Sequence, residues 1–349
     1  MNLFRAEELR YPQVRAFNRE HAIAFLPVSA LEVHGEHLPV GMDMFMARWM
    51  AEETARRFAE AHPDWDVVLY PPLTIGTDEL PLPGSMNVTQ RTLYRALTEL
   101  GPSFARAGYG YVVVTNGHGG ARHASGLEAA CRHVSRRHGI AMFTPAIVVL
   151  HAIVSGNRRD RLETILGRPL TDEEQASIGG GEHAAIWETS FELAERGELV
   201  DPMYRQLGPD GPPPFRPLAM LGQPLLWLVR RRGEPERAAR LGEIVNSLAG
   251  GIGWLLNARF GYGGHQVTYD GNPSVASTDL GRAFRQLVAE DCLAIVESVV
   301  RGERTAEEVR SIASDPIIIH PLFWRRLALG MGGALALALA LSLYRPRRT

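Results

Sequence analysis

The residues with the clearest chemical potential lie in one segment, which reads Leu-Glu-Val-His-Gly-Glu-His-Leu-Pro-Val-Gly-Met-Asp from Leu31 to Asp43. It directly follows the apolar run Ala22–Val28. Its candidate metal-binding side chains are Glu32, His34, His37 and Asp43. Carboxylate and imidazole are ligands that divalent zinc, manganese and iron accept. Residues two apart in an extended segment point the same way, so Glu32 and His34 can face one ion or a pair of ions. The segment is typical of a metal-dependent hydrolase.

Two residues of this segment allow more than one interpretation. An aspartate just before a helix is commonly an N-cap, and Asp43 alone would be read that way. Beside Glu32 and His34 we favour a metal ligand that bridges two ions. His37 either orients a ligand from outside the metal site or is a hydrogen-bonded loop histidine.

A second motif, Asn-Gly-His-Gly-Gly, spans Asn116–Gly120. His118 sits in a glycine-flanked turn, where the backbone can approach a site closely. The Lys-Ser/Thr pair of a phosphate-binding P-loop is missing after it. The histidine therefore favours metal binding over phosphate binding.

The third cluster, Gly-Glu-His-Ala-Ala-Ile-Trp-Glu-Thr-Ser, spans Gly181–Ser190. We expect a helix here that begins at Glu182 and runs to Leu193. On an ideal helix His183 and Glu188 would point roughly 140° apart. They reach one cavity only if the helix start is distorted or the cavity wraps around its end. A plain amphipathic helix explains this cluster equally well on its own.

Strands and helices alternate in the first half of the chain and would position these motifs. We expect strands at Ala22–Val28, Val67–Tyr70, Tyr111–Thr115 and Ile140–Phe143, and helices at Met44–Ala61, Thr89–Ala107 and Arg122–Arg137. Such alternation predicts an α/β fold with a mainly parallel sheet between two helical layers. Sites in these folds lie beyond the carboxyl ends of the strands. The Glu32 segment and the His118 turn both follow strands, so we expect them at one edge of the sheet.

The second half predicts fewer elements. Leu207–Pro217 is rich in Gly and Pro and is expected to be a surface loop or a lid. Pro235–Leu256 and Leu280–Val300 are expected to be helical. We place a hydrolase domain at residues 1–301, a linker at 302–322 and a membrane anchor at 323–349.

The anchor prediction rests on Leu327–Tyr344, which contains no charged residue and is flanked by arginines. Spanning a bilayer takes about 20 apolar residues, with a lower limit near 17. Phe323, Trp324 and Tyr344 suit interfacial positions. The alternative is a buried terminal helix, although this run lacks a polar face. We expect a single C-terminal transmembrane helix with the catalytic domain on the cytoplasmic side. Arginines flank both ends, so the positive-inside rule does not fix the orientation.

The composition of the chain narrows its class. The 349 residues carry a formal net charge of -2, with 37 Lys and Arg against 39 Asp and Glu. Without a basic field or a basic stripe interleaved with aromatics, we expect no nucleic-acid partner. The two cysteines, Cys131 and Cys292, lie outside any CxxC pattern, which argues against a disulfide framework and for a reducing compartment.

The three clusters, in this order and spacing, resemble the creatininase (creatinine amidohydrolase) family. The family shows a Glu-x-His-Gly-x-His-Leu-Pro segment followed by an Asp, an Asn-Gly-His turn, and a Glu-Thr-Ser segment preceded by a histidine. Gly271–Ser277 also matches its Gly-Asp/Asn-Pro pattern. The resemblance covers about Ala22 to Phe284, and only the first motif is highly specific.

The resemblance implies a fold with a two-metal site. Glu32, Asp43 and His118 would hold one ion, while His34 and Asp43 would hold the other, with Asp43 bridging. Creatininase has a further glutamate two residues after the Asn-Gly-His histidine, where this chain has Gly120. Glu188 is our candidate for the vacant ligand position.

The same resemblance assigns catalytic roles. His183 would shuttle a proton to the leaving nitrogen, and we count the adjacent Glu182 among the catalytic residues. Zinc is the first expectation for the metal, with manganese and iron also compatible. Family members commonly form homo-oligomers, so we expect one here.

The leading functional hypothesis is an amidohydrolase that cleaves a non-peptide C–N bond, in a cyclic amide or a formamide. The nucleophile would be a hydroxide bridged by two divalent metals, since such ions lower the pKa of bound water from about 15.7 toward 7. One alternative is a peptidase of the same family that trims a small precursor peptide. Another is an inactive membrane-tethered binding or scaffold protein. The departure at Gly120 argues against creatinine itself as the substrate.

Overall fold

A parallel sheet forms the centre of the computed structural model, which describes residues 2–178, 182–231, 235–311 and 320–322. Its strand order is β1-β3-β2-β5-β6, with β4 also paired to β2, and every pairing is parallel. The strands are β1 (Leu3–Arg5), β2 (Ala22–Ser29), β3 (Asp66–Leu69), β4 (Leu73–Thr74), β5 (Tyr111–Thr115) and β6 (Ala141–Phe143). The predicted parallel sheet is confirmed, and each predicted strand is present to within one residue at either end.

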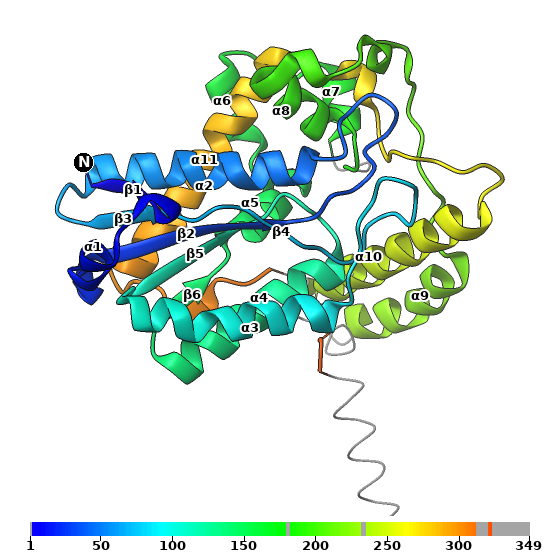
Figure 1. The fold of residues 1–349 in the computed structure, drawn as a ribbon. Helices are drawn as coiled ribbons and strands as arrows, with labels where there is room; N and C mark the ends of the chain where they lie inside the picture. The colour runs from blue at the N-terminus through cyan, green and yellow to red at the C-terminus, as the bar shows by residue number, and fades with distance from the viewer. Residues whose placement is uncertain (1, 179–181, 232–234, 312–319, 323–349) are drawn as a thin grey trace, which may run out of the picture.

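Helices cover both faces of the sheet, as Figure 1 shows. Ile23 and Phe25 of β2 pack into one core cluster, while Ala24 and Leu26 pack into another on the opposite face. This alternation follows from the period of two along a strand, and it requires an apolar layer on each side. The first layer contains α2 (Met42–Ala61) and α11 (Thr278–Val300), and the second contains α3 (Gln90–Ala107) and α4 (Ala121–His138). The expected α/β/α arrangement is therefore present.

A further group of helices shares a core with α11, and α6, α7 and α8 of this group lie above α2 in Figure 1. Its core includes Trp187 and Phe284, whose rings stack with centroids 4.9 Å apart. The helices are α5 (Pro145–Val154), α6 (Arg159–Leu166), α7 (Asp172–Ser177) and α8 (Ile186–Arg196). The sequence patterns did not predict α5, α6 or α7.

The predicted helix start at Glu182 is wrong, because α8 begins at Ile186. Ala184 has a positive φ of 53°, a conformation that interrupts a helix. The backbone of His183 instead pairs with Asp270 in an antiparallel bridge. His183 thus lies on an extended segment, and Glu188 lies in the first turn of the helix that follows.

Two helices, α9 (Arg216–Arg231) and α10 (Pro235–Phe260), pack against each other at the right of Figure 1. The irregular segment predicted at Leu207–Pro217 is irregular as far as Phe215, after which α9 begins. Asp210 exchanges backbone hydrogen bonds of 3.0 and 2.8 Å with Gly271, which ties the segment to the chain after α10.

The chain after α11 returns to the domain. Val309 is buried in the core beneath α11, and the Ser311 N–H donates a 2.7 Å hydrogen bond to Glu128 on α4. This part of the predicted linker therefore packs against the fold. The predicted anchor at 323–349 lies outside the described residues. Within the residues that are described, none of the helices combines the length and apolar character needed to cross a membrane.

Candidate active site

The acidic and histidine motifs meet where β2 and β5 end. The register between these neighbouring strands pairs Pro27 with Thr115, so the segments that follow them leave the sheet side by side. Glu32 and His118, which lie on those two segments, come within 2.9 Å of each other (Oε2 to Nδ1). The expected location at the carboxyl edge is therefore confirmed.

Asp43 lies in the first turn of α2 and is 1% exposed. The residue at the N-cap position is Gly41, and no side chain caps this helix start. The two Asp43 oxygens instead face different histidines. Oδ2 lies 3.1 Å from Nδ1 of His118, and Oδ1 lies 3.2 Å from Nε2 of His34. This geometry suits a carboxylate that bridges two cations and does not support the N-cap interpretation.

The Asn-Gly-His turn is built to bring His118 against α2. The Asn116 side chain accepts a 3.1 Å hydrogen bond from the His118 N–H and donates one of 2.6 Å to the His118 carbonyl. A Cβ at Gly117 would lie only 2.4 Å from the backbone oxygen of Asp43. Only glycine permits this close approach between the turn and the helix.

Glu188 reaches the site from α8. Its Oε2 lies 3.5 Å from Nε2 of His34 and accepts a 2.6 Å hydrogen bond from the Ala184 N–H. The break before α8 lets His183 and Glu188 point into the same region. This is the arrangement expected if the start of the helix is distorted. The absence of a side chain at position 120 also has a steric reason. A Cβ there would lie 2.5 Å from Nε2 of His118.

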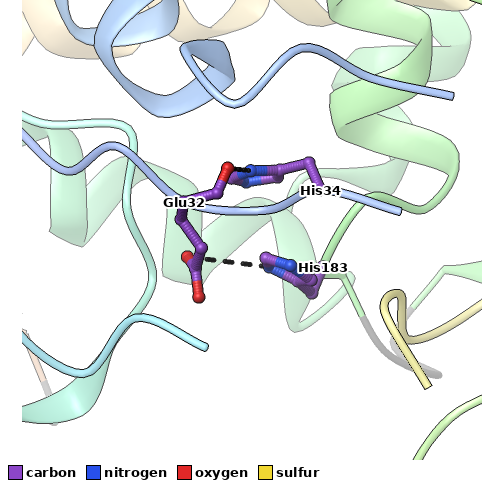
Figure 2. Close-up of side chains that lie close together, drawn as sticks. All are labelled: Glu32, His34 and His183. Atoms are coloured by element: carbon purple, nitrogen blue, oxygen red, sulfur yellow. Dashed lines mark hydrogen bonds and ion pairs between the residues drawn. The ribbon is translucent and has the colours of Figure 1, made fainter. Parts of the chain in front are cut away.

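Each of three histidines directs one ring nitrogen at a backbone carbonyl. The contacts are His34 Nδ1 to Glu32 O at 2.9 Å, His118 Nε2 to Thr77 O at 3.1 Å, and His183 Nε2 to Val33 O at 2.7 Å. A carbonyl only accepts, so these nitrogens carry the proton in the neutral ring and the other nitrogens are left with a lone pair. Figure 2 shows the His34 contact and the approach of His183 to Glu32. Outward N–H groups of this kind are typical of metal-bound histidines.

The inward-facing atoms form two groups that share Asp43. Glu32, Asp43 and His118 make one group, and His34, Asp43 and Glu188 make the other. Among the described residues, Glu32 Oε2, His34 Nε2 and Asp43 Oδ2 are buried and lack a hydrogen-bond partner. Carboxylate oxygens that face imidazole lone pairs repel unless a proton or a metal ion lies between them. The donor set therefore fits two divalent ions.

The electrostatics of the site point the same way. Burial alone would lower the pKa of His34, but the carboxylates of Asp43 and Glu188 raise it to about 10. Burial raises the pKa of Glu188 to about 7. The protein thus holds protons tightly in the space between these groups. Cations of higher charge would take the place of those protons.

The remaining predicted residues differ in their placement. His183 approaches Glu32, with Nδ1 3.9 Å from Oε2, and burial lowers its pKa to about 4 despite that carboxylate. His37 lies outside the groups, and its Nε2 contacts the hydroxyl of Thr189 at 2.9 Å, beside Glu188. Glu182 is half-buried and belongs to none of the metal-type groups found among the described residues.

Sequence reasoning missed two neighbours of His118. Glu79 and His123 are buried and form with His118 a further carboxylate–imidazole group. Glu79 follows β4, a short strand at the same carboxyl edge of the sheet. The strand-end rule would have located it, but the two residues of β4 leave almost no sequence signal.

The fold and the two groups that share an aspartate define an α/β/α protein with a candidate two-metal centre. The model of the creatininase family, described as creatinine amidohydrolase, matches residues 7–296. The chain belongs to this family and is a hydrolase that acts on carbon–nitrogen bonds.

Solved structures agree on the fold. A crystal structure of creatinine amidohydrolase (creatininase) is similar with a TM-score of 0.52 at 18% identity, covering 85% of this chain and 97% of that one. A manganese form of creatininase gives 0.52 at 19% identity, covering 86% and 98%. A variant of Zn-Zn type gives 0.51 at 19%, covering 86% and 97%. Creatininases thus hold manganese or a zinc pair on this fold.

A curated relative matches a shorter part of the chain. The mycofactocin precursor peptide peptidase of Mycolicibacterium smegmatis (strain ATCC 700084 / mc(2)155) is 33% identical over 100 residues. The match spans 28% of this chain and 40% of that relative.

Proposed function

We propose that this protein hydrolyses a non-peptide C–N bond, in a cyclic amide or a formamide, at a centre of two divalent metal ions. The observation that carries the proposal is the orientation of His34 and His118. Each directs its N–H outward to a carbonyl and its lone pair at Asp43. This arrangement costs free energy without cations between the groups and gains it with them.

The residues divide into two ligand sets. Glu32, Asp43 and His118 would hold one ion, and Glu188 would join His34 and Asp43 around the other. When bound, such a pair of ions supplies a nucleophile at neutral pH and polarises the scissile carbonyl. Zinc and manganese both suit these ligands, and iron is also compatible.

His183 is suited to proton transfer beside this centre. Its Nε2–H is fixed on the Val33 carbonyl, so Nδ1 is the atom free to accept a proton, and it faces Glu32. The neutral ring can take a proton from the attacking water at Nδ1 and deliver it to the departing nitrogen. Glu182 remains a sequence-based prediction for a catalytic residue.

The substrate is expected to differ from creatinine. Where creatininase has its further glutamate, this chain has Gly120. No side chain fits at that position without displacing His118 or Asp78. The second ion therefore depends on a carboxylate from α8. A different ligand direction would change the space in which an amide can bind.

A peptidase function is the second candidate, and the match to the mycofactocin precursor peptide peptidase favours it. Both reactions attack a carbonyl carbon and release an amine, so the same side chains serve either one. The two functions differ in the length of the substrate that must reach these side chains.

One experiment tests the reaction and its ligands together. Full-length protein loaded with zinc or manganese is assayed on creatinine, hydantoin, N-formyl amines and short peptides. We expect turnover of a cyclic amide or formamide by the native protein, and none by Asp43→Ala, which should lose both ions. Exclusive cleavage of peptides would establish the alternative function. Two ions retained in Asp43→Ala would contradict the bridging role.

We also propose that Leu327–Tyr344 anchors the protein in a membrane by a single C-terminal helix, on the sequence grounds given above. Deletion of residues 323–349 should move the protein from the membrane fraction to the supernatant with its catalytic constants nearly unchanged. Misfolding of the deleted protein would instead support a buried terminal helix.

A further inference from the structure

The ring of His183 contacts two other rings. One is that of His34, with ring centroids 4.3 Å apart and planes inclined by 31°. The other is that of Trp254, at 5.3 Å and 73°. Trp254 belongs to α10, outside the motifs that carry the candidate ligands. A helix distant from these motifs in sequence thus contacts the residue with the clearest proton-transfer geometry.

Trp254 is itself tied to the segment that pairs with His183. Its indole N–H donates a 3.2 Å hydrogen bond to Oδ2 of Asp270. The Asp270 backbone N–H donates a 2.7 Å hydrogen bond to the carbonyl of His183. These contacts form a closed circuit that runs from the His183 backbone through Asp270 and Trp254 back to the His183 ring.

The local structure around Asp270 permits this circuit of contacts. A Cβ at Gly211 would lie 2.2 Å from Oδ1 of Asp270, so any larger residue there would displace that carboxylate. The neighbouring Asp210 and Gly271 pair through two backbone hydrogen bonds. The irregular segment before α9 therefore packs against the carboxylate that orients the indole.

We propose that Trp254 and Asp270 are positioning residues that hold the His183 ring with Nδ1 directed at Glu32. The inference rests on the proposed function, in which His183 transfers the proton. The Val33 carbonyl fixes only one ring nitrogen, at 2.7 Å, and leaves the ring able to tilt about that contact. The Trp254 ring restricts that tilt where it meets the imidazole, and the His34 ring adds a second contact.

The test compares four variants of the full-length protein. Trp254→Ala removes the ring contact, Asp270→Ala removes the acceptor, and Asp270→Asn keeps an oxygen that can accept the indole N–H. Trp227→Phe on α9 is the matched control, because that tryptophan is 54% exposed. Each is first checked for melting temperature and bound zinc, which should equal those of the native protein.

The first readout needs no substrate. Long-range 1H–15N spectra of histidine-labelled protein at pH 8 report the tautomer of each ring, and His183→Gln assigns the signal. We expect the native His183 to be protonated at Nε2, as in Asp270→Asn and Trp227→Phe. Trp254→Ala and Asp270→Ala should shift or broaden this signal. A His183 signal unchanged in both alanine variants would overturn the proposal.

The second readout is turnover of an amide that the native protein hydrolyses. Misplacement of a reacting group by about 1 Å costs up to 10²-fold, so we expect kcat to fall roughly 10- to 100-fold in both alanine variants with KM nearly unchanged. Asp270→Asn should restore most of the rate. Equal losses in Asp270→Asn and Asp270→Ala, or loss of zinc in either, would reduce the role to folding and contradict positioning. An intact tautomer effect without any turnover by the native protein would refute the proposed function alone.

Discussion

Replacement of Gly120 by alanine tests how the structure controls the proposed metal ligand His118. The added Cβ would lie 2.5 Å from Nε2 of His118 and 2.8 Å from Cβ of Asp78, where ordinary contact begins near 3.4 Å. One of these groups must move by on the order of 1 Å, because overlap at such distances is strongly repulsive. The His118 ring is the group that can rotate, and doing so breaks its 3.1 Å hydrogen bond to the Thr77 carbonyl.

The expected cost follows from the role of that hydrogen bond. Loss of an outer partner of a metal-bound histidine typically reduces metal affinity by about 10- to 100-fold, or about 1.4 to 2.7 kcal/mol. Only the ion held by His118 should be affected. We therefore expect one of two zinc equivalents to weaken by this factor in Gly120→Ala while the other is unchanged.

The measurement is competition for zinc against a chromophoric chelator, which resolves the two equivalents. Gly119→Ala is the control, since a Cβ at the adjacent residue would have no atom within 4 Å. Both variants should melt close to the native temperature. Equal zinc affinities in Gly120→Ala and Gly119→Ala would refute the steric account of this position.

Three further changes probe other parts of the structure. Glu188→Gln should release one ion of two by elemental analysis, whereas Glu192→Gln, one turn along α8, should keep both; retention in each would remove Glu188 from the ligand set. Burial raises the pKa of Glu192 from 4.5 to about 7, so its stabilising contribution is complete below pH 4.5 and is lost as the pH rises through 7. Between pH 5 and pH 8, the loss of stability measured by urea unfolding should therefore be smaller in Glu192→Gln than in the native protein, by at most about 3 kcal/mol; identical pH profiles would contradict this. Gly117→Ala should lower the free energy of unfolding by about 1 to 3 kcal/mol, because its Cβ would lie 2.4 Å from a backbone oxygen of α2; an unchanged midpoint in denaturant would show that the turn can relax.

The α/β half of the fold could be predicted because its signals are local. Strands such as Tyr111–Thr115 are continuous apolar runs, and the intervening helices have regular periodicity. The order of strand and helix then dictates a parallel sheet with its loops at one edge. That edge was enough to place the Glu32 segment beside the His118 turn, whereas the grouping of both with Asp43 came from the family resemblance.

The parts that could not be predicted depend on long-range contacts. The start of α8 is set by the pairing of His183 with Asp270, which lie 87 residues apart in sequence, and by a positive φ at Ala184. Helical periodicity in the sequence indicates neither the pairing nor the positive φ. Trp254 likewise has no motif around it, and only the packing of α10 places it at the site.

The measurement that tests the central claim most directly is the metal content of the full-length protein, purified in detergent without chelators and analysed for zinc, manganese and iron. The two groups that share Asp43 predict about two ions per chain, restored after chelation by adding zinc or manganese. A single ion would contradict the paired centre and the role of Glu188. No ion after reconstitution with all three metals would contradict a metal-dependent hydrolase altogether.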